Sequence, residues 1–192
     1  MKFLFIQDYR HKYRYFSLEP NPQIQVKFSR WRKIWDQARK KLMLLPPKIL
    51  NQEQALAKAL KIEGENVQIL VSGLLSAKKV KSKFYFFLQK QRTKHIFFLI
   101  GEALLLPLSG LAVILPGPNV FFGILALLMI THWQALRGAN RLLKKKCQFI
   151  PSSLLKDWEE ALKSKNEKNL LSILEKMASE YQLPSIRKLL WK

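Results

Sequence analysis

The chain has 192 residues and a formal net charge of +21, which suits one domain or a domain with an appendage. Such an excess of Lys and Arg favours polyanionic partners, either nucleic acid or an anionic membrane surface. The single cysteine, Cys147, excludes an internal disulfide framework. The sequence has no P-loop, dinucleotide-binding glycine motif or nucleophile elbow, so we expect no enzyme activity.

Residues 1–75 are expected to form a basic α+β region. Alternating or β-branched runs favour strands, whereas apolar residues repeating every three or four positions favour helices. The pair Pro46-Pro47 ends a first helix, and Asn51 can cap a second one. The elements predicted here are strands over residues 2–7, 11–16 and 67–72 and helices that begin at Ser29 and Asn51.

A basic amphipathic helix is predicted over residues 76–95. Its apolar side contains Val80, Phe84 and Phe87, and lysines crowd its other sides. Such a helix can lie on an anionic bilayer surface, or it can pack against a core with its lysines in solvent. The first interpretation gives a lipid-facing basic set that flanks the apolar middle of the chain: Lys78, Lys79, Lys81, Lys83, Lys144, Lys145 and Lys146.

Residues 96–136 are predicted to form a membrane helical hairpin. The twenty residues from Ile96 to Leu115 carry one charge, and residues 120–130 carry none. Twenty helical residues match a hydrocarbon core of ~30 Å. Residue types that favour a turn separate the two arms: Pro116, Gly117, Pro118 and Asn119. The alternative is a buried core hairpin in a soluble protein.

The charges on either side of this run predict its orientation. Residues 1–95 carry 21 Lys or Arg against 6 Asp or Glu, and residues 134–192 carry 13 against 6. Basic flanks stay on the cytoplasmic side, and two crossings place both flanks there. We therefore expect a bacterial inner-membrane protein with both termini cytoplasmic, or a mitochondrial inner-membrane protein if the source is eukaryotic. Pro107 and Gly110 leave open whether the hairpin spans or re-enters.

Two polar residues inside the run are candidate functional groups. Folding the hairpin about its turn brings Glu102 level with His132, where the two could share a charge-assisted hydrogen bond and relay a proton. The alternative is an interfacial anchor, in which Glu102 reaches the headgroups and Trp133 lies at the interface. His95, Glu102 and His132 follow no recognised metal-ligand spacing, so no metal and no cofactor is predicted.

Residues 137–192 are expected to form a C-terminal helical region. The basic helix that follows the hairpin continues to Lys146, and Pro151 then breaks the chain. Apolar residues at helical spacing predict three further helices, over residues 153–164, from Asn166 and from Pro184.

Short motifs on both sides of the turn follow one pattern. They are a Pro-Leu-Ser segment, the Pro-Gly-Pro-Asn turn, an aromatic pair and Thr-His-Trp-Gln-Ala-Leu-Arg-Gly, with positions Pro107, Phe121, Phe122, Thr131, Trp133, Ala135 and Gly138. Together they resemble the mitochondrial potassium–proton exchange-related family, although Leu128 replaces an arginine of its pattern. The resemblance implies a membrane protein connected with cation–proton exchange. A weaker resemblance is to small bacterial membrane proteins with a Pro-Gly-Pro-Gly-Trp turn.

The sequence thus predicts an α+β protein, mostly α, with a membrane helical hairpin and basic extramembrane segments. The expected function is monovalent cation (K+)/proton exchange, as an oligomer or an accessory factor, because one hairpin alone encloses no substrate path. Anionic lipid headgroups and a second copy or a membrane-protein partner are expected, and nucleic acid is not. Two alternatives stay open: a membrane-anchored scaffold that binds anionic lipid or a protein partner, and a soluble basic nucleic-acid-binding protein.

Overall fold

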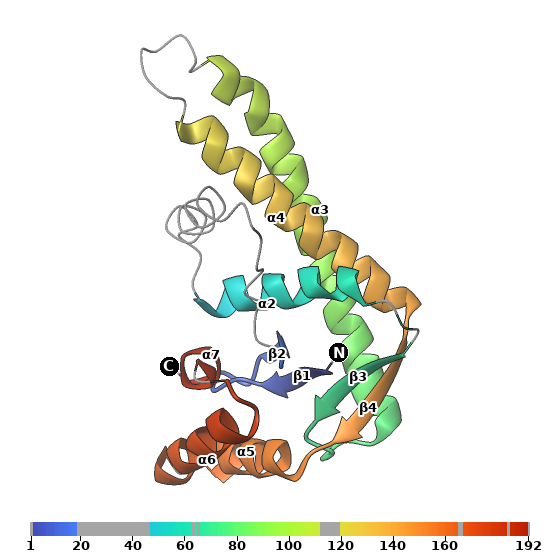
Figure 1. Ribbon diagram of the computed structural model, residues 1–192, viewed down its shortest axis with the longest axis vertical. Coiled ribbons are helices and arrows are strands. Elements are labelled where there is room, and N and C mark those ends of the chain that lie inside the picture. The colour runs from blue at the N-terminus through green and yellow to red at the C-terminus, as the bar shows by residue number, and fades with distance from the viewer. Residues whose placement is uncertain are drawn as a thin grey trace, which may run out of the picture.

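The computed structural model describes residues 2–18, 47–62, 64, 66–111, 120–164, 167–183 and 185–191. A four-stranded mixed sheet in the order β2-β1-β3-β4 lies between helices on both of its faces (Figure 1). The strands are β1 (Lys2–Gln7), β2 (Tyr13–Ser17), β3 (Asn66–Val71) and β4 (Lys146–Pro151). The helices are α2 (Pro47–Lys58), η1 (Ala59–Lys61), α3 (Ala77–Leu111), α4 (Val120–Lys144), α5 (Ser153–Ser164), α6 (Glu167–Glu180) and α7 (Ile186–Leu190).

Strand β1 shows why the sheet is buried on both faces. It pairs antiparallel with β2 and parallel with β3, and β3 pairs parallel with β4. Successive side chains of a strand point to opposite faces. Phe3 and Phe5 therefore join the core formed with α2, α3 and α4, whereas Leu4 and Ile6 join the core formed with α5, α6 and α7.

Helices α3 and α4, called the arm below, form the connection between the parallel strands β3 and β4. Parallel neighbours need such a crossover, because a tight turn cannot join them. The two helices pack against each other and extend well past the sheet, while α2 crosses α4 close to the sheet (Figure 1). Helix α2, which precedes β3 in the chain, and the base of the arm thus form one layer on the same face of the sheet.

The prediction of a membrane-spanning hairpin is wrong. Among the residues that the structure describes, no helix combines the length and the apolar character needed to cross a membrane. Helices α3 and α4 do form a pair, but Lys94, Glu102 and His132 interrupt its apolar stretches. Glu102, Thr131 and His132 are buried by protein, so part of the apolar surface around them serves packing between helices.

Most of the other predicted elements that fall on described residues are present. Strand β1 and helix α5 have the predicted bounds, and β2 and β3 are displaced by one or two residues. Helix α2 begins at Pro47 rather than Asn51, because proline suits a first helical turn, where no backbone N–H donor is needed. Strand β4 was not predicted, since it is a short edge strand that ends in Pro151. The helix expected at Ser29, and the turn over residues 116–119, lie outside the described residues.

Candidate functional site

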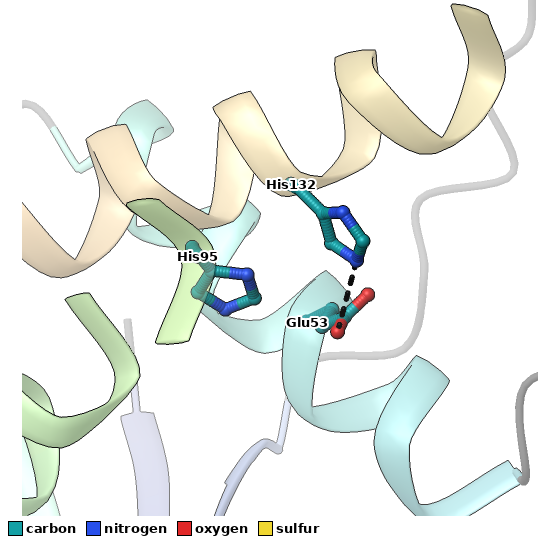
Figure 2. A group of neighbouring side chains, drawn as sticks. All are labelled: Glu53, His95 and His132. Atoms are coloured by element: carbon teal, nitrogen blue, oxygen red, sulfur yellow. Dashed lines mark ion pairs between the residues drawn. The ribbon is translucent and has the colours of Figure 1, made fainter. Parts of the chain in front are cut away.

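Three helices bring ionisable side chains together where α2 crosses the arm. Glu53 comes from α2, His95 from α3 and His132 from α4, and their side chains point toward one another (Figure 2). One ligand-type atom from each residue lies within 4.8 Å of the other two. His132 Nε2 is 3.8 Å from Glu53 Oε1, and the two imidazole ring centroids are 5.5 Å apart. With Glu102, these residues form what is called the His-Glu cluster below.

Glu102 lies on the other side of the His132 ring. Its Oε1 is 2.6 Å from His132 Nδ1, in a buried hydrogen bond. The ring of Phe98 stacks on the same imidazole, with centroids 5.0 Å apart. His132 is therefore held in one orientation, with Nδ1 toward Glu102 and Nε2 toward Glu53. The relay of a proton by Glu102 and His132 stays a prediction.

His95 has an environment that is rare for an imidazole. Its side chain is 0% exposed, yet neither ring nitrogen has a hydrogen-bond partner among the described residues. One helical turn earlier, the buried Gln91 Oε1 also lacks a partner in the described part of the chain. Buried polar groups in proteins are nearly always hydrogen-bonded, and leaving one unpaired costs about 1–3 kcal/mol.

A lysine lies beside the cluster, and burial shifts the pKa values of its ionisable groups. Lys94 Nζ lies 3.6 Å from Glu53 Oε1, and the Lys94 side chain is one-third exposed. Burial lowers the pKa of His95 to about 3, with Lys94 and His132 adding to the effect, and lowers the pKa of His132 to about 4. Burial also raises the pKa of Glu102 to about 7, aided by the charge of Glu53. These shifts favour the neutral form of both imidazoles.

Gly138 explains how α2 approaches α4 closely enough to complete this site. A Cβ atom placed at Gly138 would overlap the backbone carbonyl of Leu56. Leu56 lies one turn after Glu53 on α2, and Gly138 lies two turns after His132 on α4. Ala135, between them, is fully buried in the same core. These two small residues of the family-like motif thus set the helix spacing at the cluster.

The other motif residues differ in how far they are buried. Thr131 is buried and donates from Oγ1 to the Leu127 carbonyl, whereas Trp133 is 53% exposed. Pro107 is exposed within α3. Phe121 and Phe122 lie in the first turn of α4.

The predicted lipid-facing lysines gather at the opposite end of the arm from most of its exposed apolar residues, although the exposed Phe86 lies close to them. Lys83 donates to Tyr13 Oη at 3.3 Å, and Lys145 donates to the Gly64 carbonyl at 2.6 Å. At 1.5 Å per residue, Lys81 and Phe97 are separated by about 24 Å along α3. The basic set is Lys78, Lys79, Lys81 and Lys83 at the start of α3, and Lys144, Lys145 and Lys146 where α4 meets β4.

Sequence reasoning missed Glu53. Nothing in the segment Asn51-Gln-Glu-Gln separates it from an ordinary surface residue of an amphipathic helix. The signal exists only in three dimensions, because α2 meets α4 through a crossing that no local pattern specifies. His95 was weighed as a ligand together with Glu102, whereas the structure places Glu53 between the two histidines and Glu102 behind His132.

Comparison with protein families gives a match over the larger part of the chain. The family model described as mitochondrial K+-H+ exchange-related matches residues 19–145, about two-thirds of the chain. The matched region contains α2, β3, the arm and every residue of the His-Glu cluster. The match confirms the resemblance drawn from the motifs around the turn. No curated protein and no solved structure matches the chain.

Proposed function

The chain belongs to the mitochondrial K+-H+ exchange-related family, and on that premise we propose that it acts in K+/H+ exchange as an accessory protein at the mitochondrial inner membrane. The observation that carries this proposal, beyond the family, is the surface of the arm. Among the described residues, nine large apolar side chains of the arm are exposed, and a large exposed apolar surface marks contact with a protein or a membrane. They are Phe86, Ile96, Phe97, Phe98, Ile100, Leu104, Leu105, Ile130 and Trp133.

A groove on α3 combines apolar and cationic groups. It has a volume of about 620 Å³ and is lined by Phe86, Gln89, Lys90, Thr93, Lys94, Phe97 and Phe98. Phe86 and Phe97 are 67% and 77% exposed. Aromatic rings beside ammonium groups suit an amphiphile that has an acyl chain and an anionic headgroup. Anionic lipid is therefore the membrane contact that the groove favours.

An accessory role fits the arm better than independent transport does. Transport pathways run between several helices, and the arm consists of two. In mitochondria whose copy of this protein is deleted, we expect K+-dependent proton flux to fall and to recover when the full chain is returned. Purified protein in liposomes should give no flux. Flux from the purified protein alone would make it the exchanger itself, and unchanged flux in the deleted mitochondria would overturn a role in exchange.

Lipid contact is tested separately with vesicles. We expect the full chain to cosediment with vesicles containing phosphatidylserine and to do so less with phosphatidylcholine alone. Lys90→Glu should weaken binding about tenfold, because each lysine near an anionic surface contributes about 1 kcal/mol. Lys156→Glu, on the far helix α5, is the matched control. Equal losses in both variants would assign the effect to overall charge rather than to the groove.

A further inference from the structure

We propose that Glu53, His95 and His132 bind one divalent transition-metal ion of the zinc class where α2 meets the arm. This site is independent of the proposed role in exchange, since it rests on the geometry of three side chains. It would tie α2, α3 and α4 together through one ion.

The donor set selects the class of metal. Two imidazole nitrogens and one carboxylate oxygen form an established ligand set for Zn²⁺. Mg²⁺ and Ca²⁺ prefer all-oxygen sites, and K+ is held by rings of oxygen atoms. Ligand atoms around a tetrahedral zinc lie about 3.3 Å apart, given metal–ligand distances near 2.0–2.1 Å. The atoms here lie within 4.8 Å of one another, so side-chain rotations that shorten the longest separation by about 1.5 Å would bring them to this spacing.

Glu102 is a hydrogen-bond partner for the second nitrogen of His132, as a metal-binding histidine requires. A ligating imidazole almost always uses its second nitrogen to donate to a carboxylate or carbonyl, which fixes its tautomer and orientation. His132 Nδ1 lies 2.6 Å from Glu102 Oε1, so a proton on Nδ1 leaves the Nε2 lone pair directed at the Glu53 side. A simple ion pair between Glu102 and His132 would not require a second carboxylate on the opposite nitrogen.

The isolation of His95 is the second, independent observation. Its two nitrogens are fully enclosed without a hydrogen-bond partner among the described residues, a state that costs stability. A metal bond to one nitrogen would give that nitrogen the partner it lacks and so relieve part of the cost.

Lys94 is the group that competes with the metal. Its ammonium lies 3.6 Å from Glu53 Oε1, where it partly neutralises the carboxylate. The side chain is one-third exposed, so it can turn into solvent when a cation enters. Removing the Lys94 charge should therefore strengthen metal binding, an effect opposite to that of removing a ligand.

The test uses the full chain without a histidine tag, stripped of metal with EDTA. Zn²⁺ is titrated against a chromophoric chelator, and Co²⁺ is added to a second sample for absorption spectra. We expect one equivalent to bind and Co²⁺ to give visible bands of tetrahedral nitrogen and oxygen coordination. No thiolate charge-transfer band should appear, because Cys147 lies outside the cluster.

Variants separate this site from surface binding. Glu53→Gln and His95→Gln should weaken Zn²⁺ binding by more than about 100-fold, beyond the 10–100-fold typical of an outer partner. Glu102→Gln should weaken Zn²⁺ binding by about 10–100-fold, because Glu102 is such an outer partner. Lys94→Gln should strengthen binding, and His11→Asn, which changes the one histidine outside the cluster at an exposed turn, should leave it unchanged.

The outcomes are decisive in both directions. Circular dichroism of each metal-free variant establishes that it folds. Zn²⁺ affinity that is the same in wild type, Glu53→Gln and His95→Gln would overturn the proposal, as would dependence on His11. Because Lys94 is partly exposed, its variant should fold even if the ligand variants do not. Weaker or unchanged binding in Lys94→Gln would then overturn the proposal by itself.

Discussion

Buried polar groups beside the sheet have hydrogen-bond partners, whereas a buried imidazole of the His-Glu cluster has none among the described residues. Asp8, at the end of β1, is 0% exposed and accepts from the Arg10 and Lys12 backbone N–H groups and from Arg14 Nε, at 2.8–2.9 Å. Glu159 on α5 is 6% exposed and accepts from Ser72 Oγ at 2.6 Å. Asp8 links the end of β1 to the following turn and to β2, and Glu159 links α5 to the end of β3. Each carboxylate accepts hydrogen bonds from the protein.

The cluster where α2 meets the arm is equally buried but has a different composition. It contains carboxylates and two neutral imidazoles, and His95 has no hydrogen-bond partner among the described residues. Natural proteins break the rule that buried polar groups are paired mainly where function requires it. The comparison shows that the polar groups beside the sheet are satisfied within the protein, whereas His95 in the cluster lacks a partner among the described residues, as the proposed metal site requires.

The largest effect should come from removing a carboxylate that the fold needs. Asp8→Ala leaves two backbone donors and the Arg14 guanidinium without their acceptor, and Arg14 is mostly buried. We expect the free energy of unfolding to fall by about 3 kcal/mol, measured by urea titration. Asp157→Ala, at an exposed position of α5, should change it by less than about 0.5 kcal/mol. Similar values for both variants would contradict the structural role of Asp8.

The next effect concerns the helix contact that builds the cluster. Gly138→Ala places a methyl group against the Leu56 carbonyl, so α2 and α4 must separate. We expect a loss of about 2 kcal/mol in the free energy of unfolding, together with weaker Zn²⁺ binding.

Gly101→Ala is the matched control for that contact, since Gly101 also lies inside a helix but has open space around it. It should raise the free energy of unfolding by about 0.5–1 kcal/mol, because alanine favours helix more than glycine does. Opposite signs for the two variants would support the close approach of α2 to α4. A stabilising Gly138→Ala would disprove it.

These differences also define what the sequence could predict. The short continuous apolar run of β1 and the helical periodicity of α5 are local signals, so both elements were predicted with their observed bounds. The pairing of Glu102 with His132 was accessible because one turn relates the two helices. Glu53 was not accessible, since it depends on how α2 crosses α4. The apolar run was assigned to lipid because sequence hydropathy does not reveal which of its residues protein covers.

A third prediction compares His95 with Glu159 directly. In EDTA, His95→Leu should raise the free energy of unfolding by about 1 kcal/mol, because it replaces an unpaired buried imidazole with an apolar side chain of similar size. Glu159→Gln should lower it by about 1 kcal/mol, since it weakens a charge-assisted bond from Ser72. If His95→Leu destabilised the metal-free protein as much as Glu159→Gln does, the imidazole would be a structural group and the contrast would disappear.

The smallest effect concerns Cys147, a polar group of β4 that the fold keeps in its neutral form. Burial raises the pKa of its thiol from 9.0 to about 11, although Lys81 acts in the opposite direction. Two pKa units reduce the thiolate fraction at pH 8 about 100-fold, so iodoacetamide should alkylate the native protein about 100-fold more slowly than the urea-unfolded chain. Between pH 9 and pH 11 the Cys147 thiol keeps its proton in the native state but loses it in the unfolded state. The contribution of this thiol to the free energy of unfolding is therefore fully present below pH 9 and is lost as the pH rises through 11. The Cys147→Ala variant should lack that part of the pH dependence. Rapid alkylation of the native chain at pH 8 would show that partial burial does not raise the pKa of this thiol.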